Sequence, residues 1–319
     1  MTGVCKLKEC GAPGVGCHLG HDDYSQCKNF VAEAKETKVK KQKTIEQKKS
    51  SLGWSGLAFN IDDIELISSR TSPILIGIVG KVDAGKTTFL AMLYTLLLSG
   101  KKLKEYNFAG TKTILGWDAL YHRLIFKKGN VAFPLPTPVN SNRLYHFALR
   151  NKEHQLKDIL LADASGEVFS SWSVNRNEEL AENARWIYAN SNAFMLFIDC
   201  EALLNDKNAA KKEVMLIARQ LTHDLKNRPV IAVWSKSDKK AEVLLSIREA
   251  LKSELEALFS NYTEIEISNF LEPGPDDLVH INNLAVVDWL LEKIMIPSAS
   301  DFTIEKIFSD DLFINYKGK

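Results

Sequence analysis

The chain has 319 residues, of which 45% are hydrophobic and 25% are charged, and its formal net charge is +1 at pH 7. A chain of this length can bury a sizeable core, and its near-neutral balance gives no reason to expect nucleic acid or a membrane as a partner. The longest apolar runs, such as LAMLYTLLL at 90–98, fall short of the roughly 18 residues that span a bilayer, and the first residues hold no secretory signal, so we place the protein in the cytoplasm.

Residues 1–27 form the first expected module, because four of the five cysteines lie there. The segment is too poor in apolar residues to fold without a staple, and cytosolic cysteines bind metal more often than they form disulfides. Zinc takes four Cys or His ligands in a tetrahedron. The expected ligands are Cys5, Cys10 and Cys27 with either Cys17 or His21. The C-x4-C spacing matches no standard finger, so a disordered tail with free thiols and a disulfide-bonded segment are the alternatives to a structural Zn²⁺ module that docks a partner.

Residues 28–72 are expected to form a basic linker that ends in a lead-in helix. The part from 28 to 49 holds eight lysines against three glutamates, which is typical of a solvated helix or a flexible chain. Asn60 directly precedes IDDIELISS and can cap a short helix there.

From residue 73 onward, short β-rich apolar runs alternate with amphipathic stretches of helical length. This alternation is typical of a parallel sheet covered by helices, so we expect an α/β fold with a mostly parallel, six-stranded sheet over residues 73–296. The expected strands are 74–79, 143–150, 157–162, 193–198, 229–234 and 263–267. The expected helices are 86–99, 112–126, 178–190, 207–226, 240–260 and 281–295. The tail at 297–319 could add a strand or a short helix.

The segment GKVDAGKT at 80–87 fits the phosphate-loop pattern G-x-x-x-x-G-K-[ST] and lies between a buried strand and a helix. Its glycines let successive backbone N–H groups point at phosphate oxygens, aided by the positive end of the following helix. In this pattern Lys86 bridges the terminal phosphates and the Thr87 hydroxyl binds Mg²⁺. The residues expected to touch the nucleotide are Val82, Asp83, Ala84, Gly85, Lys86, Thr87 and Thr88.

A second site must select the base, and PVIAVWSKSD at 229–238 can do so. The Lys236 stem can lie along the purine face while the Asp238 carboxylate accepts hydrogen bonds from guanine N1–H and N2–H. Adenine has no matching pair of donors, so GTP and GDP are the expected ligands. Ser268 and Asn269, which follow TEIEI, occupy the place where a backbone N–H can contact guanine O6.

The third element is ILLADASGE at 159–167, an apolar strand that ends in D-A-S-G. We expect Asp163 to lie beside the phosphate loop and to hold Mg²⁺ through water. The Gly166 N–H is expected to sense the γ-phosphate.

Together these motifs resemble the P-loop GTPases of the translation-factor and Ras-like class, over about residues 73–296. The Val82–Asp83 pair is similar to that of translational GTPases, which implies that Asp83 places a monovalent cation near the phosphates or stabilises the loop. Ser235 stands where Asn is usual in the class. The lead-in GWSGLAF, the segment FAGTKTILGWDAL and DASGE resemble the bacterial double-GTPase family, which is associated with multi-protein conflict or defence systems.

The resemblance also implies where the switch threonine lies. In the class a threonine just before the second strand closes over Mg²⁺ and the γ-phosphate. Thr137, in the loop LPTPVNSN, matches that position, and Thr111 and Thr113 are the alternatives.

Glu167 stands where Ras-like enzymes carry the glutamine that orients the attacking water. An ionised carboxylate can accept a proton but cannot donate a hydrogen bond, so we expect slow intrinsic hydrolysis. Arg176 and Arg185 follow in the switch segment. Either could supply positive charge to the transition state, although solvated arginines on a helix face are the simpler interpretation.

The sequence therefore predicts a Mg²⁺-dependent GTPase switch that is controlled by, or controls, a protein effector or activator. A nucleotide-dependent oligomer is one output that such a switch can have. Hydrolysis as slow as about 10⁻⁴ s⁻¹, raised about 10³- to 10⁵-fold by a partner, suits such a role. A GTP-binding scaffold with little hydrolysis and an ATP-driven P-loop enzyme are the alternatives.

Overall fold

In the computed structural model the described residues are 3–12, 14–32, 54–69, 72–123, 142–269, 278 and 280–295. The chain divides into two compact units, residues 1–53 and 54–319. Thr137 and the tail at 297–319 lie outside the described residues, as does most of the basic linker.

The first unit is built on a short antiparallel strand pair. β1 (Gly3–Cys5) pairs with β2 (Phe30–Ala32). Between them lies a 3₁₀ turn, η1 (Tyr24–Gln26), which is capped by the carboxylate of Asp23. The strand pair brings the two ends of the cysteine-rich segment together, and Cys27 is buried there.

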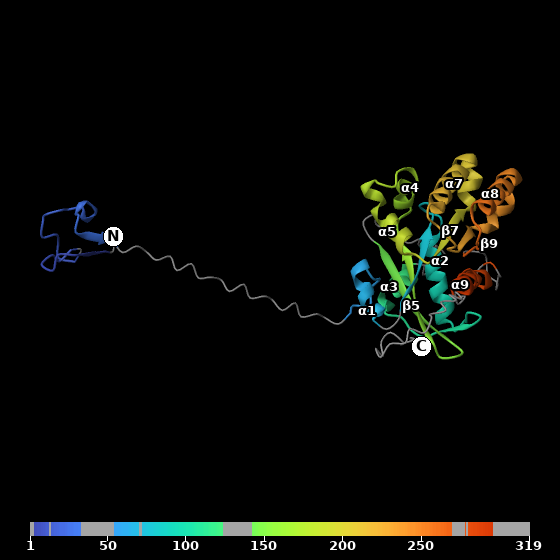
Figure 1. The fold of residues 1–319 in the computed structure, drawn as a ribbon, viewed down its shortest axis with the longest axis horizontal. Coiled ribbons are helices and arrows are strands. Elements are labelled where there is room, and N and C mark those ends of the chain that lie inside the picture. The colour runs from blue at the N-terminus through green and yellow to red at the C-terminus, as the bar shows by residue number, and fades with distance from the viewer. Residues whose placement is uncertain are drawn as a thin grey trace, which may run out of the picture. The chain divides into compact units, whose positions relative to one another are not determined.

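The second unit is layered around a seven-stranded sheet (Figure 1). The strands are β3 (Ile74–Val79), β4 (Tyr106–Phe108), β5 (Arg143–Asn151), β6 (Leu156–Asp163), β7 (Ala193–Asp199), β8 (Val230–Ser235) and β9 (Tyr262–Glu266). Their spatial order is β4-β5-β6-β3-β7-β8-β9. The five strands from β6 to β9 in this order are parallel, and β4 and β5 form an antiparallel edge.

The six expected strands are all present, each within one residue of its expected ends, but the prediction of six strands is wrong. The additional strand, β4, has three residues and pairs with β5 at the edge of the sheet. None of its side chains is buried. A three-residue segment without a buried face is too short to produce the apolar run that marks a typical strand of about 5 residues.

Helices connect the strands and cover the sheet. They are η2 (Ile61–Ile64), α1 (Glu65–Ser68), α2 (Lys86–Leu98), α3 (Ile114–Arg123), α4 (Gly166–Val174), η3 (Glu179–Ala181), α5 (Glu182–Asn190), α6 (Cys200–Asp206), α7 (Asn208–Thr222), η4 (Ser237–Glu242), α8 (Leu245–Leu258) and α9 (Ile281–Ile294). Two of them, α4 and α6, were not expected. Both are short, and α6 is separated from α7 by Lys207, whose φ of 48° interrupts the helical path.

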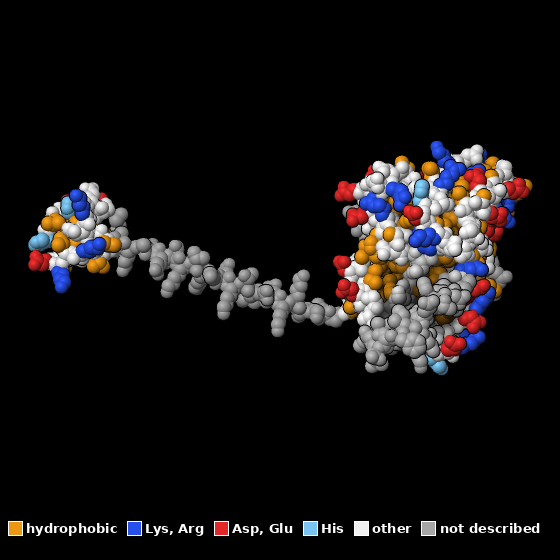
Figure 2. Space-filling view, viewed as in Figure 1, with side chains coloured by type: hydrophobic (Ala, Val, Ile, Leu, Met, Phe, Trp, Pro, Cys, Tyr) orange, Lys and Arg blue, Asp and Glu red, His pale blue; other side chains and the backbone are white. Residues whose placement is uncertain are grey.

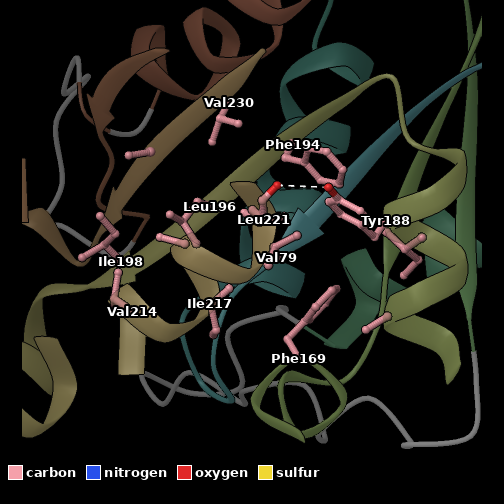
Figure 3. Packing of buried hydrophobic residues seen from close by; sticks show 14 of the residues in the cluster. Val79, Phe169, Tyr188, Phe194, Leu196, Ile198, Val214, Ile217, Leu221 and Val230 are labelled. Carbon is pink, nitrogen blue, oxygen red and sulfur yellow. Dashed lines mark hydrogen bonds between the residues drawn. The ribbon is translucent and has the colours of Figure 1, made fainter. Parts of the chain in front are cut away.

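Alternate side chains of each strand point to opposite faces of the sheet. On one face, Ile76 and Ile78 of β3 pack with α2, α3 and α9. On the other face, Leu75 and Val79 pack with helices α4 to α8. Figure 3 shows this second layer, in which the Tyr188 hydroxyl donates a hydrogen bond of 3.2 Å to the Leu221 carbonyl. The sheet is therefore buried on both faces, as its apolar strands predict.

The lead-in segment belongs to the second unit. Asn60 begins η2, as expected, and its backbone N–H donates to the Asp63 carboxylate at 2.8 Å. Just before it, Phe59 is fully buried and exchanges both backbone hydrogen bonds with Leu144 of β5, each at 2.9 Å. The Trp54 ring packs on Phe59, with 4.8 Å between ring centroids. Since β6 occupies the other side of β5, this lead-in extends the antiparallel edge beyond the end of β4.

On the visible face of the second unit, acidic and basic side chains are interspersed (Figure 2). This mixture agrees with the near-zero net charge of the sequence. Within the described ranges, the helices are all too short or too polar to span a bilayer.

Candidate functional site

The loops that follow the parallel strands converge on a cavity of about 630 Å³. Four separate segments line it, namely 82–88, 164–167, 235–239 and 267–269, together with Glu201. In a parallel α/β sheet, ligands bind in the crevice outside the carboxyl ends of the strands. The cavity is within the range of about 300–1,000 Å³ that is typical of small-molecule sites. The structure thus brings together the phosphate-loop, D-A-S-G, S-K-S-D and Ser268–Asn269 motifs.

The phosphate loop runs from the end of β3 into α2. Gly85, the residue before α2, has φ +83°, a left-handed conformation that favours glycine. Lys86 is 6% exposed, and its Nζ donates to the carbonyls of Gly80 at 3.0 Å and Lys81 at 2.7 Å. Burial lowers the pKa of Lys86 to about 8, although Asp163 and Asp83 oppose this shift. The ammonium group is therefore held at the loop, where a bound anion would raise the pKa of Lys86 again and keep it charged.

The candidate metal ligands lie at the edge of this loop. The Thr87 hydroxyl donates to the Asp163 carboxylate at 3.3 Å, and Asp163 is fully buried at the end of β6. A hydroxyl and a carboxylate are the hard oxygen donors that Mg²⁺ takes in nucleotide sites. The pair therefore fits a magnesium ion.

Gly166 is pressed against the phosphate loop. A Cβ at this position would lie 2.0 Å from the Val82 backbone nitrogen and 2.3 Å from the Lys81 carbonyl carbon, so only glycine fits. Ser165 caps α4 by accepting the Glu167 N–H at 3.3 Å. Glu167, which follows Gly166, is exposed and lines the cavity. The start of α4 therefore touches the loop that would hold the phosphates.

The residues expected to read the base are far from the phosphate loop in sequence but line the same cavity. They follow the carboxyl ends of β8 and β9. The Ser268 hydroxyl donates to Asp238 Oδ1 at 2.6 Å, which fixes the orientation of that carboxylate. The Asn269 side-chain oxygen accepts a 2.8 Å hydrogen bond from Asn283 of α9. Lys236 has φ +52° and lines the same cavity.

Three lining residues outside the recognised motifs, Glu201, Lys239 and Ile267, were not expected from the sequence. Glu201 lies just after β7, separated from the run AFMLFID only by Cys200, and it forms ion pairs with Lys236 and Lys239. Its position two residues beyond Asp199, at the carboxyl end of a buried parallel strand, is the signal that could have identified it.

The alternatives for the switch threonine are engaged elsewhere. Thr111 and Thr113 both donate to the His146 carbonyl in the middle of β5, and Thr113 is fully buried. His146 pairs with Leu160, three residues before Asp163 on β6, which places these threonines roughly 10 Å from the metal end of the strand. Thr137 falls outside the described residues.

The two arginines of the switch segment do not line the cavity. Arg185 Nη1 donates to the carbonyls of Arg176 at 2.5 Å and Glu178 at 2.7 Å. Its guanidinium therefore braces the turn before α5. Within the part of the chain that the structure describes, neither arginine is positioned at the phosphate loop.

The four N-terminal cysteines lie near one another. The Cys10 Sγ accepts the His18 backbone N–H at 3.5 Å. However, no group of three or more Cys, His, Asp or Glu side chains among the described residues is arranged to hold a metal ion. The arrangement of these side chains therefore does not support the expected zinc site of Cys5, Cys10, Cys17, His21 and Cys27.

Comparison with known proteins identifies the family of the second unit. A family model described as Double-GTPase 2 matches residues 74–291, from the first residue of β3 into α9. No match to a curated protein was found. The matched span covers more than half of the 319 residues and includes every segment that lines the cavity. The chain therefore belongs to the Double-GTPase 2 family, in agreement with the resemblance that its lead-in and D-A-S-G motifs predicted.

Proposed function

We propose that the protein is a magnesium-dependent GTPase that acts as a molecular switch on a protein partner. Membership of the double-GTPase family implies GTP binding and hydrolysis. The observation that carries the proposal for this chain is the single cavity lined both by the phosphate loop at 82–88 and by the Asp238–Ser268 pair.

In this proposal each end of the cavity has its own task. Backbone N–H groups of the phosphate loop and the Lys86 ammonium bind the phosphates. Asp238, oriented by Ser268, accepts hydrogen bonds from the guanine N1–H and N2–H. Thr87 and Asp163 would hold Mg²⁺, and the ion would supply positive charge to the phosphates.

Hydrolysis requires water to attack the γ-phosphorus while the bond to the bridging β–γ oxygen breaks, which yields GDP and phosphate. Glu167 lines the cavity next to Gly166, and its carboxylate can accept a hydrogen bond or a proton from that water. Because it cannot donate a hydrogen bond when ionised, slow intrinsic turnover is the expected behaviour.

The switch part of the proposal is supported by the contact between Gly166 and the phosphate loop. A γ-phosphate placed at that loop would be sensed at the start of α4, and its loss would change the surface that α4 presents. The resemblance to conflict-associated proteins supports a partner from a bacterial multi-protein defence system as part of this proposal. Nucleotide-dependent self-association is one form that this output can take. The proposed function does not include a zinc-bound docking module, because no metal-holding group of side chains was found among the described residues.

Calorimetric titration with GTP, GDP and ATP in the presence of Mg²⁺ tests nucleotide binding. We expect both guanine nucleotides to bind and ATP to bind at least about 100-fold more weakly, since an adenine leaves Asp238 without its two donors. Asp238→Asn should weaken GTP and improve binding of xanthosine triphosphate, whose C2 oxygen replaces the amino group. A chain that binds ATP as well as GTP would contradict the proposal.

A GTP-binding scaffold with little hydrolysis is the second candidate, and the presence of Glu167 at the cavity favours it. Single-turnover phosphate release separates the two functions. Release that stays at the uncatalysed level, with and without partner, would favour the scaffold.

A further inference from the structure

The loop that carries Asp238 adopts a conformation that needs support. Lys236, at its start, has φ +52°, a left-handed region that non-glycine residues seldom occupy. The Ser235 hydroxyl donates to the Ile198 carbonyl of β7 at 3.2 Å, and the Ser237 N–H donates to Ile267 at 3.1 Å. These bonds tie the loop to its neighbouring strands, but they do not hold the Lys236 side chain.

The Lys236 side chain is held by the corner between β7 and α6. Asp199 is the N-cap of α6, and its Oδ1 accepts the N–H groups of Glu201 at 2.9 Å and Ala202 at 3.3 Å. The other oxygen of Asp199, Oδ2, accepts the Lys236 ammonium at 2.8 Å. This carboxylate is thus fixed by the helix and offers Lys236 a rigid partner.

Glu201, the second residue of α6, completes the arrangement. Its Oε2 accepts the Lys236 ammonium at 3.0 Å, and its Oε1 accepts the Lys239 ammonium. Asp238 lies between these two lysines in the chain, so one glutamate restrains the loop on both sides of the base-reading carboxylate. Hydrogen bonds from Lys239 and then Lys236 lower the pKa of Glu201 to about 2, so the carboxylate is ionised at neutral pH.

We propose that Glu201, assisted by Asp199, is a positioning residue for guanine recognition, and that it acts through Lys236 and Lys239. Both of its carboxylate oxygens bind lysines, so its role is to place the loop rather than to bind the base. Three contacts then define the position of Asp238, namely its direct bond to Ser268 and the two flanking lysines. This inference rests on the proposed function of the cavity.

The test compares Glu201→Gln with wild type for binding of GDP, GTP, inosine triphosphate and inorganic tripolyphosphate. Glu254→Gln is the matched control, because Glu254 is 37% exposed against 39% for Glu201 and also pairs with two cations, Lys211 and Arg219, away from the cavity. Asp199→Asn is a less suitable variant, since it would also alter the cap of α6.

We expect Glu201→Gln to weaken GDP and GTP binding about tenfold, because the amide cannot retain two charged hydrogen bonds. Its preference for GTP over inosine triphosphate, which lacks the N2–H donor, should shrink. Tripolyphosphate binding and the melting temperature should match those of Glu254→Gln. Unchanged guanine affinity and selectivity, or an equal loss of GDP and tripolyphosphate, would overturn the inference. Failure of the wild-type chain to bind GDP or GTP would instead overturn the proposed function.

Discussion

The phosphate end and the base end of the cavity are built in different ways. At the phosphate end, one continuous segment supplies backbone groups, a buried lysine and a glycine, and Gly166 closes against it without room for a side chain. At the base end, three separate segments meet through side-chain charges, and Lys236 and Glu201 are 32% and 39% exposed. Close packing therefore determines the phosphate end, whereas ion pairs between distant parts of the chain determine the base end.

The largest expected effect is at the phosphate end. Lys86→Ala removes the buried ammonium that lies over the loop, and we expect GTP affinity to fall about 10³-fold, since two charge-assisted hydrogen bonds to phosphate are lost. Calorimetry with GTP and Mg²⁺ measures this loss. Lys211→Ala, which removes a partly exposed lysine of α7 that pairs with Glu254 away from the cavity, is the control and should bind as wild type. A loss of GTP affinity below tenfold would mean that Lys86 does not bind the phosphates.

The next effect tests close packing directly. Gly166→Ala places a Cβ 2.0 Å from the Val82 nitrogen, so α4 must move away from the phosphate loop. We expect single-turnover hydrolysis to fall about 100-fold, because displacements near 1 Å have costs of that order. GDP affinity should change far less, since Gly166 does not read the base. Ser173→Ala, on the same helix, is the control, and equal rates in both variants would contradict the tight contact.

A smaller effect is expected at the base end. Ser268→Ala removes the 2.6 Å hydrogen bond that orients Asp238, and we expect GDP affinity to fall about tenfold, the usual cost of one hydrogen bond to a charged group. Competition between GDP and tripolyphosphate would show whether the loss is confined to the base. Ser246→Ala, exposed on α8, provides the comparison. No change in guanine affinity would mean that the ion pairs alone suffice to orient Asp238.

The smallest effect comes from pH. In the protein without nucleotide, burial lowers the pKa of Lys86 to about 8. Bound phosphates favour the charged ammonium, so the pKa of Lys86 is higher in the complex. The affinity for GDP is then highest below the pKa that Lys86 has without nucleotide, and it falls as the pH rises through that pKa. Between about pH 7.5 and 8.5 we expect a roughly threefold loss of GDP affinity. This pH dependence should vanish in Lys86→Ala.

Most of the sheet could be predicted from sequence, because buried parallel strands leave apolar runs with helices between them. The same holds for the phosphate loop, whose fixed residues are contiguous. β4 could not be predicted, since none of its three side chains is buried. The antiparallel direction of β5 also leaves no mark on its own residues, because pairing direction depends on the partner strand.

The base end was only partly predictable for a related reason. Lys236 and Asp238 stand in one motif, so they could be recognised together. Glu201 lies 35 residues before Lys236, and its ion pairs exist only because the sheet places β7 beside β8. Similarly, the spacing of Thr111 and Thr113 could not show that both hydroxyls are engaged with His146.

The backbone bridge between Phe59 and Leu144 determines where the second unit can be cut. A fragment that starts at Pro73, where the strand-and-helix alternation begins, would lack Phe59 and the Trp54 ring that covers it. In such a fragment the backbone N–H and C=O of Leu144, near the start of β5, would lose their partners in Phe59. Unpaired groups at a strand edge are a common cause of strand-to-strand aggregation. Expression from Trp54 or earlier should avoid that problem and yield material fit for nucleotide measurements.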